Sequence, residues 1–303
     1  MKSIRLFIRL SRLIYILIAA LLYLLGIGIA HYLSGIINWN SFFLGFIWLV
    51  LILLGFQYLN EYFDLDIVPE NPAWWRTPFS GSSGALGPGK LPRPVALWAG
   101  LTCLTIVASI TVLLYQFDKP DLMATIMLGL IMLGELILAI PPLHLVTSGY
   151  GELIMTLFRV GVIPVMAFLL QGHESHRLLI MVTIPLALLH LGMLLALEFP
   201  SYASDIQLDK KPILVRIGWQ RGMLLHNLLI LCSFIVFGLA FVLGLPLSLG
   251  WPVFFVLPVA VFQILMMVRI GEGAKPNWNL LGLTALSTFG MTSYILTYTF
   301  WIH

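Results

Sequence analysis

The sequence has little charge and very little cysteine. Only 10% of its 303 residues are charged, whereas 60% are hydrophobic. A soluble globular domain carries about a quarter charged residues, so this composition excludes an ordinary soluble domain and points to the bilayer. The two cysteines, Cys103 and Cys232, both lie inside apolar stretches. They therefore indicate neither a disulfide framework nor a zinc site.

Long apolar stretches recur along the whole chain. Each has about 20 residues, which is enough to cross a hydrocarbon core about 30 Å thick. The sequence therefore predicts an all-α integral membrane protein that forms a single domain over residues 1–303. Nine spans are predicted, near residues 12–33, 40–60, 94–115, 121–141, 153–171, 178–197, 222–243, 248–268 and 279–301.

The basic residues predict the orientation of these spans. Of the 16 Lys and Arg residues, all but Lys119, Arg159 and Arg177 fall in the N-terminal segment or in connections on the same side of the membrane. Positive charge favours the cytoplasmic side, so we expect a cytoplasmic N-terminus. Two connections on that side, 61–93 and 198–221, are long, and long connections are commonly functional. We expect them to cap a cytoplasm-facing active site in a bacterial or archaeal plasma membrane.

These two connections also hold more than half of the 13 acidic residues. In "NEYFD", Asn60 and Asp64 are four residues apart and share one face if the helix continues. In "LEFPSYASDIQLDKK", one oxygen-bearing stripe is predicted along the end of the sixth span, because its members are spaced by three, four and four residues. The acids of the first segment are Glu61, Asp64, Asp66 and Glu70, and the stripe consists of Glu198, Ser201, Asp205 and Asp209.

Carboxylate and amide oxygens suit a hard cation such as Mg²⁺. The candidate metal ligands are Asn60, Asp64, Asp66, Glu70, Glu198, Asp205 and Asp209. Basic residues nearby can contact phosphate, and acids and bases together favour a metal-bridged diphosphate over a bare ion. The candidate diphosphate contacts are Arg76, Arg93, Lys211 and Arg216. The alternative is that acids at helix ends are simply solvated or paired locally.

At these residues the chain resembles the UbiA-type intramembrane prenyltransferase superfamily. "NEYFD" is similar to its first Asp-rich motif, and "EFPSYASDIQLDKKPILVRIG" to its second motif with a basic tail. "RTPFSGSSGAL" and "PPLHLVTSGYGELIMTLFRVGVIPVMAFLLQ" resemble segments of the branch that prenylates 1,4-dihydroxy-2-naphthoate in quinone biosynthesis. The resemblance runs nearly end to end.

The resemblance implies a transferase. Mg²⁺ held by the two motifs would bind a polyprenyl diphosphate, whose prenyl group passes to an aromatic acceptor such as a dihydroxynaphthoate-like quinone precursor. Asp64 and Asp205 would be the catalytic positions, and no nucleic-acid partner is expected. Ser201 departs from the pattern, because it stands where the family's first Asp of the second motif is placed. This departure keeps open a terpene cyclase and a non-catalytic isoprenoid-binding relative.

Two further pairs of residues are candidates for contacting the acceptor. Glu135 and Arg159 lie within predicted spans, where ionisable side chains are functional by default, although a structural ion pair explains them equally well. Tyr62 and Tyr202 flank the acidic motifs and either face the site or anchor the chain at the interface. A transporter of a cation or organophosphate is the alternative of another class, although transporters usually bind near the midplane rather than at helix ends.

Overall fold

The computed structural model describes residues 2–64, 83–145 and 149–303. Over these ranges the chain is helical and forms no named strand. Asp66, Glu70 and Arg76, three of the predicted site residues, lie outside the described residues.

In the described ranges, nine helical spans are long and apolar enough to cross a membrane, as the sequence predicted. Six are single helices: α2 (Leu13–Ser34), α3 (Trp39–Asp64), α4 (Arg93–Phe117), α5 (Leu122–Ala139), α11 (Trp219–Val242) and α14 (Trp278–Ile302). The others are composite: α6 (Gly151–Thr156), η2 (Leu157–Val162) and α7 (Ile163–Leu169); α8 (Arg177–Glu198), η3 (Phe199–Ser201) and α9 (Tyr202–Gln207); α12 (Leu247–Gly250), η4 (Trp251–Val256) and α13 (Leu257–Gly271). Two short helices, α1 (Lys2–Leu10) and α10 (Ile213–Ile217), lie outside the spans.

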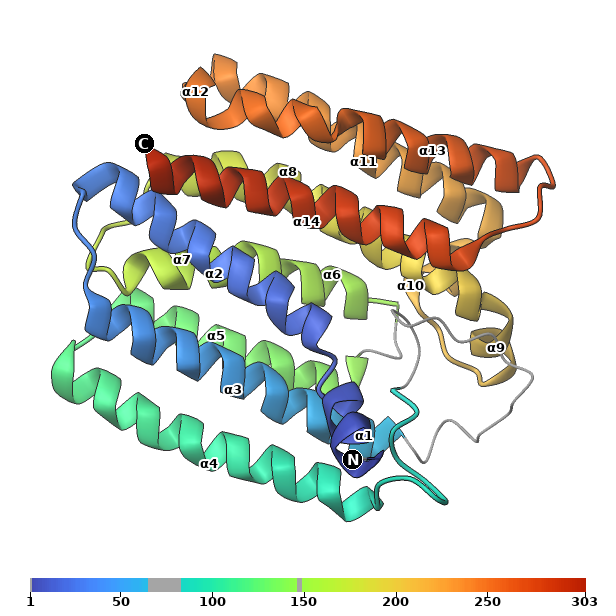
Figure 1. The fold of residues 1–303 in the computed structure, drawn as a ribbon, viewed down its shortest axis with the longest axis horizontal. Coiled ribbons are helices and arrows are strands. Elements are labelled where there is room, and N and C mark those ends of the chain that lie inside the picture. Colours follow the sequence, from blue (N-terminus) through green and yellow to red (C-terminus); the bar gives the residue numbers. More distant parts are fainter. Residues whose placement is uncertain (1, 65–82, 146–148) are drawn as a thin grey trace.

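The spans run roughly parallel or antiparallel to one another (Figure 1). α3 packs against α4 and α5, α2 packs against α7 and α14, and α8 packs against α11 and α14. α1, α9, α10 and residues 83–92 all lie at the same end of the bundle, on the right in Figure 1. The described parts of the two long connections therefore lie at the same end of the bundle, and this end is where a shared site can form.

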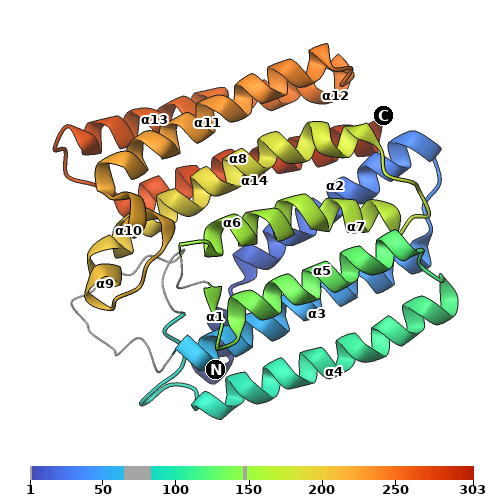
Figure 2. The same cartoon turned by 180° about the vertical axis from the view of Figure 1, so that it is seen from behind.

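The fifth span is irregular at its middle. Pro164 has no N–H to donate to the carbonyl four residues earlier, and the turn before it widens into the π-helix η2, where the Ile163 N–H bonds to the Phe158 carbonyl. η2 contacts both α5 and α8, between which the span passes in Figure 2. A Cβ on Gly134 of α5 would collide with the Phe158 ring, so glycine is needed for this approach. The wide turn also carries Arg159.

Candidate metal and diphosphate site

The first acidic motif ends α3 in a small polar cluster. The Asn60 amide donates to Asp64 Oδ2 at 3.4 Å, and Asn60 Oδ1 lies 3.0 Å from His144 Nε2. His144 Nε2 is also 3.7 Å from Asp64 Oδ1. That Oδ1 atom is buried and has no hydrogen-bond partner among the residues that the structure describes. A buried carboxylate oxygen without a donor is costly, and a bound cation would satisfy it.

His144 belongs to this cluster although the sequence analysis did not select it. It follows α5, and it is buried. Burial lowers the pKa of His144, the Asp64 carboxylate raises it and the Lys210 ammonium lowers it. The imidazole is therefore mainly neutral at neutral pH. Its place in "PPLHL" gave no signal, because only the fold brings it beside α3.

Glu61, the acid inside the first motif, has a different environment. Its carboxylate accepts from the Ser83 backbone N–H at 2.8 Å and from the Ser83 hydroxyl at 2.7 Å. It also forms an ion pair with Arg12 at 3.1 Å, and the residue is only 4% exposed. The carboxylate therefore receives these three donors from the protein itself. Glu61 therefore fastens the start of α2 and residue 83 to α3 rather than facing a ligand.

The second motif keeps the predicted stripe only as far as Asp205. α8 ends at Glu198, and α9 carries Asp205, which accepts from the Ser201 hydroxyl at 2.6 Å. Asp209 lies beyond α9 with a φ of 52°, and its carboxylate is 86% exposed and 3.2 Å from the Lys211 ammonium. The helix ends before Asp209, so the stripe extends from Glu198 to Asp205 and no farther.

Glu198 lies deeper than the rest of the second motif. Glu198 Oε2 accepts from the Leu214 backbone N–H at 3.3 Å, and its carboxyl group interacts with that of Glu152 at the start of α6. Glu152 is buried, and its Oε2 has no hydrogen-bond partner in the ranges that the structure describes. Glu152 is a further polar residue that was not among the predicted ligands. Its signal in the sequence was the "GEL" that opens the fifth span.

The cations near the site are not all the expected ones. Arg93 donates from Nε to the Tyr62 carbonyl at 3.1 Å, and its guanidinium lies 4.4 Å from the centre of the Tyr62 ring. Arg216 stacks over the Tyr150 ring at 5.1 Å. Lys211 is 57% exposed and pairs with Asp209. Lys210 acts electrostatically on both His144 and Asp205, so the charge of this lysine, rather than that of Lys211, influences both parts of the site.

Tyr202, the second predicted tyrosine, packs edge-on against Trp219 at 5.4 Å between ring centres. Trp219 in turn contacts Phe199 and Trp278. Tyr202 therefore belongs to an aromatic cluster that holds α9 against α11 and α14.

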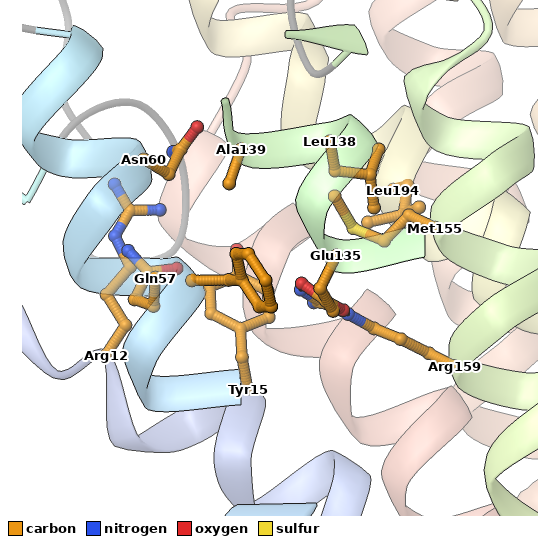
Figure 3. Close-up of a pocket in the computed structure, with 11 residues that line it drawn as sticks. Arg12, Tyr15, Gln57, Asn60, Glu135, Leu138, Ala139, Met155, Arg159 and Leu194 are labelled. Carbon is orange, nitrogen blue, oxygen red and sulfur yellow. The ribbon is translucent and has the colours of Figure 1, made fainter. Parts of the chain in front are cut away.

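Glu135 and Arg159 form an ion pair inside the bundle. Arg159 Nε donates to Glu135 Oε1 at 3.1 Å and Nη2 donates to Oε2 at 3.4 Å. The pair lines a cavity of about 130 Å³, shown in Figure 3. The cavity lining consists of Arg12, Tyr15, Phe56, Gln57, Asn60, Glu135, Leu138, Ala139, Met155, Arg159 and Leu194. Asn60 lines the cavity and contacts Asp64, so the cavity adjoins the first acidic cluster.

The candidate metal ligands that the structure describes fit a cation that is bound jointly by the protein and by phosphate oxygens of a substrate. Among the residues that the structure describes, no three His, Cys, Asp or Glu side chains gather closely enough to hold a metal ion. The predicted acids therefore do not form a complete cage in this part of the chain. Mg²⁺ does not need one, because it keeps several waters and binds through one or two carboxylates plus substrate phosphates. The unpartnered Asp64 Oδ1 and the oxygen-rich donors fit such a site.

Comparison with known proteins establishes the fold. No protein-family model matches the chain, and no curated protein sequence does. Solved structures do match: a UbiA homologue from Archaeoglobus fulgidus bound to DMAPP and Mg²⁺ is 13% identical, with a TM-score of 0.63 over 97% of this chain and 98% of its own. The same homologue bound to Cd²⁺ gives a TM-score of 0.64. A digeranylgeranylglyceryl phosphate synthase is 14% identical, with a TM-score of 0.61 over 100% and 98% of the two chains. The predicted UbiA-type fold is thus confirmed.

Proposed function

We propose that the protein is a Mg²⁺-dependent membrane prenyltransferase that uses a polyprenyl diphosphate as donor. One observation carries the proposal: two oxygen-rich motifs, on α3 and on α8 to α9, lie at one end of a UbiA-type fold, where the Lys210 charge acts on both His144 and Asp205. A homologue of this fold binds DMAPP and Mg²⁺. Because most Lys and Arg residues lie at this end, we place the site on the cytoplasmic side of a bacterial or archaeal plasma membrane.

The residues have distinct roles in this proposal. Asn60, Asp64 and Asp205 would hold Mg²⁺, which supplies positive charge to stabilise the diphosphate as it leaves. Lys210 would contact the phosphate oxygens, with Arg93 and Arg216 at the rim of the site. Asp66, Glu70 and Arg76 keep their predicted roles as metal and diphosphate contacts, although they lie outside the described residues. Glu198 and Glu152 lie behind Asp205, and Asp209 and Lys211 are set aside as a solvent-exposed pair.

The reaction breaks the bond between the first prenyl carbon and the diphosphate oxygen. A new carbon–carbon bond forms to the acceptor ring, the ring loses one proton, and diphosphate leaves. The chain supplies cationic side chains to the leaving group, and Lys210, whose charge acts on both His144 and Asp205, is the one assigned to it here. The apolar side chains of the neighbouring cavity, Phe56 and Leu138 among them, would shield the prenyl cation from water on that side.

The acceptor is proposed to be an aromatic quinone precursor. The cavity beside Asn60 has a volume of about 130 Å³. An apolar protein cavity of about 150 Å³ accommodates benzene, so one aromatic ring is the matching size. The cavity also presents polar groups, among them Glu135, Gln57 and Tyr15, which can orient hydroxyl substituents.

The test is a transfer assay with purified protein in lipid nanodiscs. Radiolabelled geranyl diphosphate would be incubated with a mixture of hydroxy-aromatic acceptors, with Mg²⁺ and with EDTA. We expect label in a prenylated aromatic product only with Mg²⁺, and its loss in Asp64→Asn and Asp205→Asn. Label in a hydrocarbon would indicate a cyclase, which the Ser201 departure leaves open. Label carried across a liposome membrane with no chemical change would indicate a transporter.

A further inference from the structure

The cavity of Figure 3 contains two arginines, and each is already paired with a carboxylate. Arg159 bonds Glu135 through two nitrogens, at 3.1 and 3.4 Å. Arg12 lies 3.1 Å from Glu61. Glu135 and Glu61 are each 4% exposed. The cations of the cavity are therefore balanced by buried carboxylates before any ligand binds.

An anionic ligand would disturb this balance. A ligand carboxylate that bonded the same two nitrogens of Arg159 would have to displace Glu135, and it would leave Glu135 buried without its partner. Breaking one side of a buried ion pair is strongly unfavourable, because an uncompensated charge remains in a region of low dielectric. A carboxylate that bound beside the intact pair would instead meet Glu135 as a like charge.

A hydroxyl group meets the opposite situation. The two oxygens of Glu135 accept one hydrogen bond each from Arg159, and an ionised carboxylate has about four acceptor positions. Lone pairs therefore remain for a donor from the cavity. A phenol supplies that donor and carries no charge, and its ring fits the apolar sides formed by Phe56, Leu138 and Leu194.

We infer that this cavity binds an uncharged hydroxy-aromatic ring whose hydroxyl donates to Glu135, and that it rejects rings bearing a carboxylate. The inference rests on the proposed function, because it takes the cavity as the acceptor site. It replaces the naphthoate-like acid expected from the sequence with a ring that lacks the acid group. Glu135 is then the residue that determines which acceptor binds, and Arg159 holds it in place.

The test compares two ligands of equal size and unequal charge. 4-Hydroxybenzamide and 4-hydroxybenzoate would be titrated against the full-length protein in nanodiscs, with binding measured by saturation-transfer NMR. At neutral pH we expect the amide to bind about tenfold tighter or better, because only the carboxylate opposes a buried carboxylate. In Glu135→Gln this preference should disappear or reverse, since Arg159 becomes available. Glu174→Gln, the same change in an exposed loop of the chain, should leave it unchanged.

Two more variants test whether Glu135→Gln merely misfolds and whether the ligands bind outside the cavity. If Glu135→Gln unfolds, the double variant Glu135→Gln/Arg159→Gln removes both charges together, and the two ligands should then bind nearly equally. Ala139→Leu fills the cavity and should abolish binding of both. Tighter binding of the benzoate to the wild type, a preference unchanged without Glu135, or full binding to Ala139→Leu would each overturn the inference.

A parallel titration with geranyl thiodiphosphate and Mg²⁺ separates this inference from the proposed function. If the diphosphate analogue binds while neither aromatic ligand does, the assignment of the cavity is wrong and the donor site stands. If the analogue does not bind either, the proposed function falls as well.

Discussion

Glu61 and Asp64, three residues apart in one motif, should respond in opposite ways to loss of charge. Glu61 is 4% exposed and holds Ser83 through bonds of 2.8 and 2.7 Å, and Arg12 through an ion pair of 3.1 Å. Within the described part of the chain, Asp64 accepts one bond of 3.4 Å from Asn60, and its Oδ1 has no donor. The first carboxylate is therefore satisfied by the protein alone, whereas the second is not.

The expected magnitudes follow from these partners. Breaking a buried ion pair from one side costs about 3–5 kcal/mol, and the 20% exposure of the Arg12 side chain places Glu61→Gln at the lower end. A misplaced amide that leaves a Ser83 donor unsatisfied adds to this cost, so we expect a loss of about 3–4 kcal/mol in the free energy of unfolding. Asp64→Asn loses no strong bond and removes a poorly solvated charge. Its free energy of unfolding should stay within about 0.5 kcal/mol of the wild type or rise.

The assay measures two quantities on each purified variant: the thermal unfolding temperature, and the Mg²⁺-dependent binding of geranyl thiodiphosphate at a temperature where all variants are folded. Glu61→Gln should unfold at a lower temperature yet bind the analogue normally. Asp64→Asn should unfold like the wild type and lose binding. The reasoning would be refuted if Glu61→Gln were as stable as the wild type, or if Asp64→Asn retained binding.

Three more predictions concern packing and charge. Gly134→Ala places a methyl group against an aromatic ring of η2 and should lower the free energy of unfolding by about 1–3 kcal/mol. Gly129→Ala on the same helix, with open space around it, should leave the free energy of unfolding unchanged or raise it. Thermal unfolding of both variants tests the difference. Lys210→Met should weaken binding of the diphosphate analogue at least several-fold, while Lys211→Met should not; equal effects would contradict the assignment of the site cation. Ser201→Asp places a second carboxylate one helical turn from Asp205. This variant should unfold at a lower temperature than the wild type in EDTA, and Mg²⁺ should raise its unfolding temperature more than that of the wild type. An unfolding temperature that does not rise with Mg²⁺ would count against a metal ion at Asp205.

The membrane spans could be predicted from the sequence because length and apolarity are local properties. Each predicted span overlaps a helix of the structure closely. The breaks inside spans were harder to anticipate. Pro164 is visible in the sequence, but whether it kinks a helix or widens a turn depends on the packing around it, here the close approach of Phe158 to Gly134.

The site was only partly predictable. The Asn60 and Asp64 pairing follows from helical spacing, and the structure keeps it. Helical spacing could not show that Glu61, on another face of the same helix, pairs with Arg12 from far away in the chain. It could not place His144 beside the motif either, because that contact depends on how α5 meets α3. Asp209 was misplaced because the helix was extended one turn beyond its end.

The most direct test of prenyl transfer is the stoichiometry of the reaction. Diphosphate release and prenylated aromatic product would be measured together, with labelled geranyl diphosphate and a phenolic acceptor, in Mg²⁺ and in EDTA. Transfer predicts one diphosphate released for each prenylated ring, and neither without Mg²⁺. Diphosphate release without consumption of the acceptor would contradict transfer and indicate cyclisation or hydrolysis, and an intact donor under all conditions would contradict the enzymatic account.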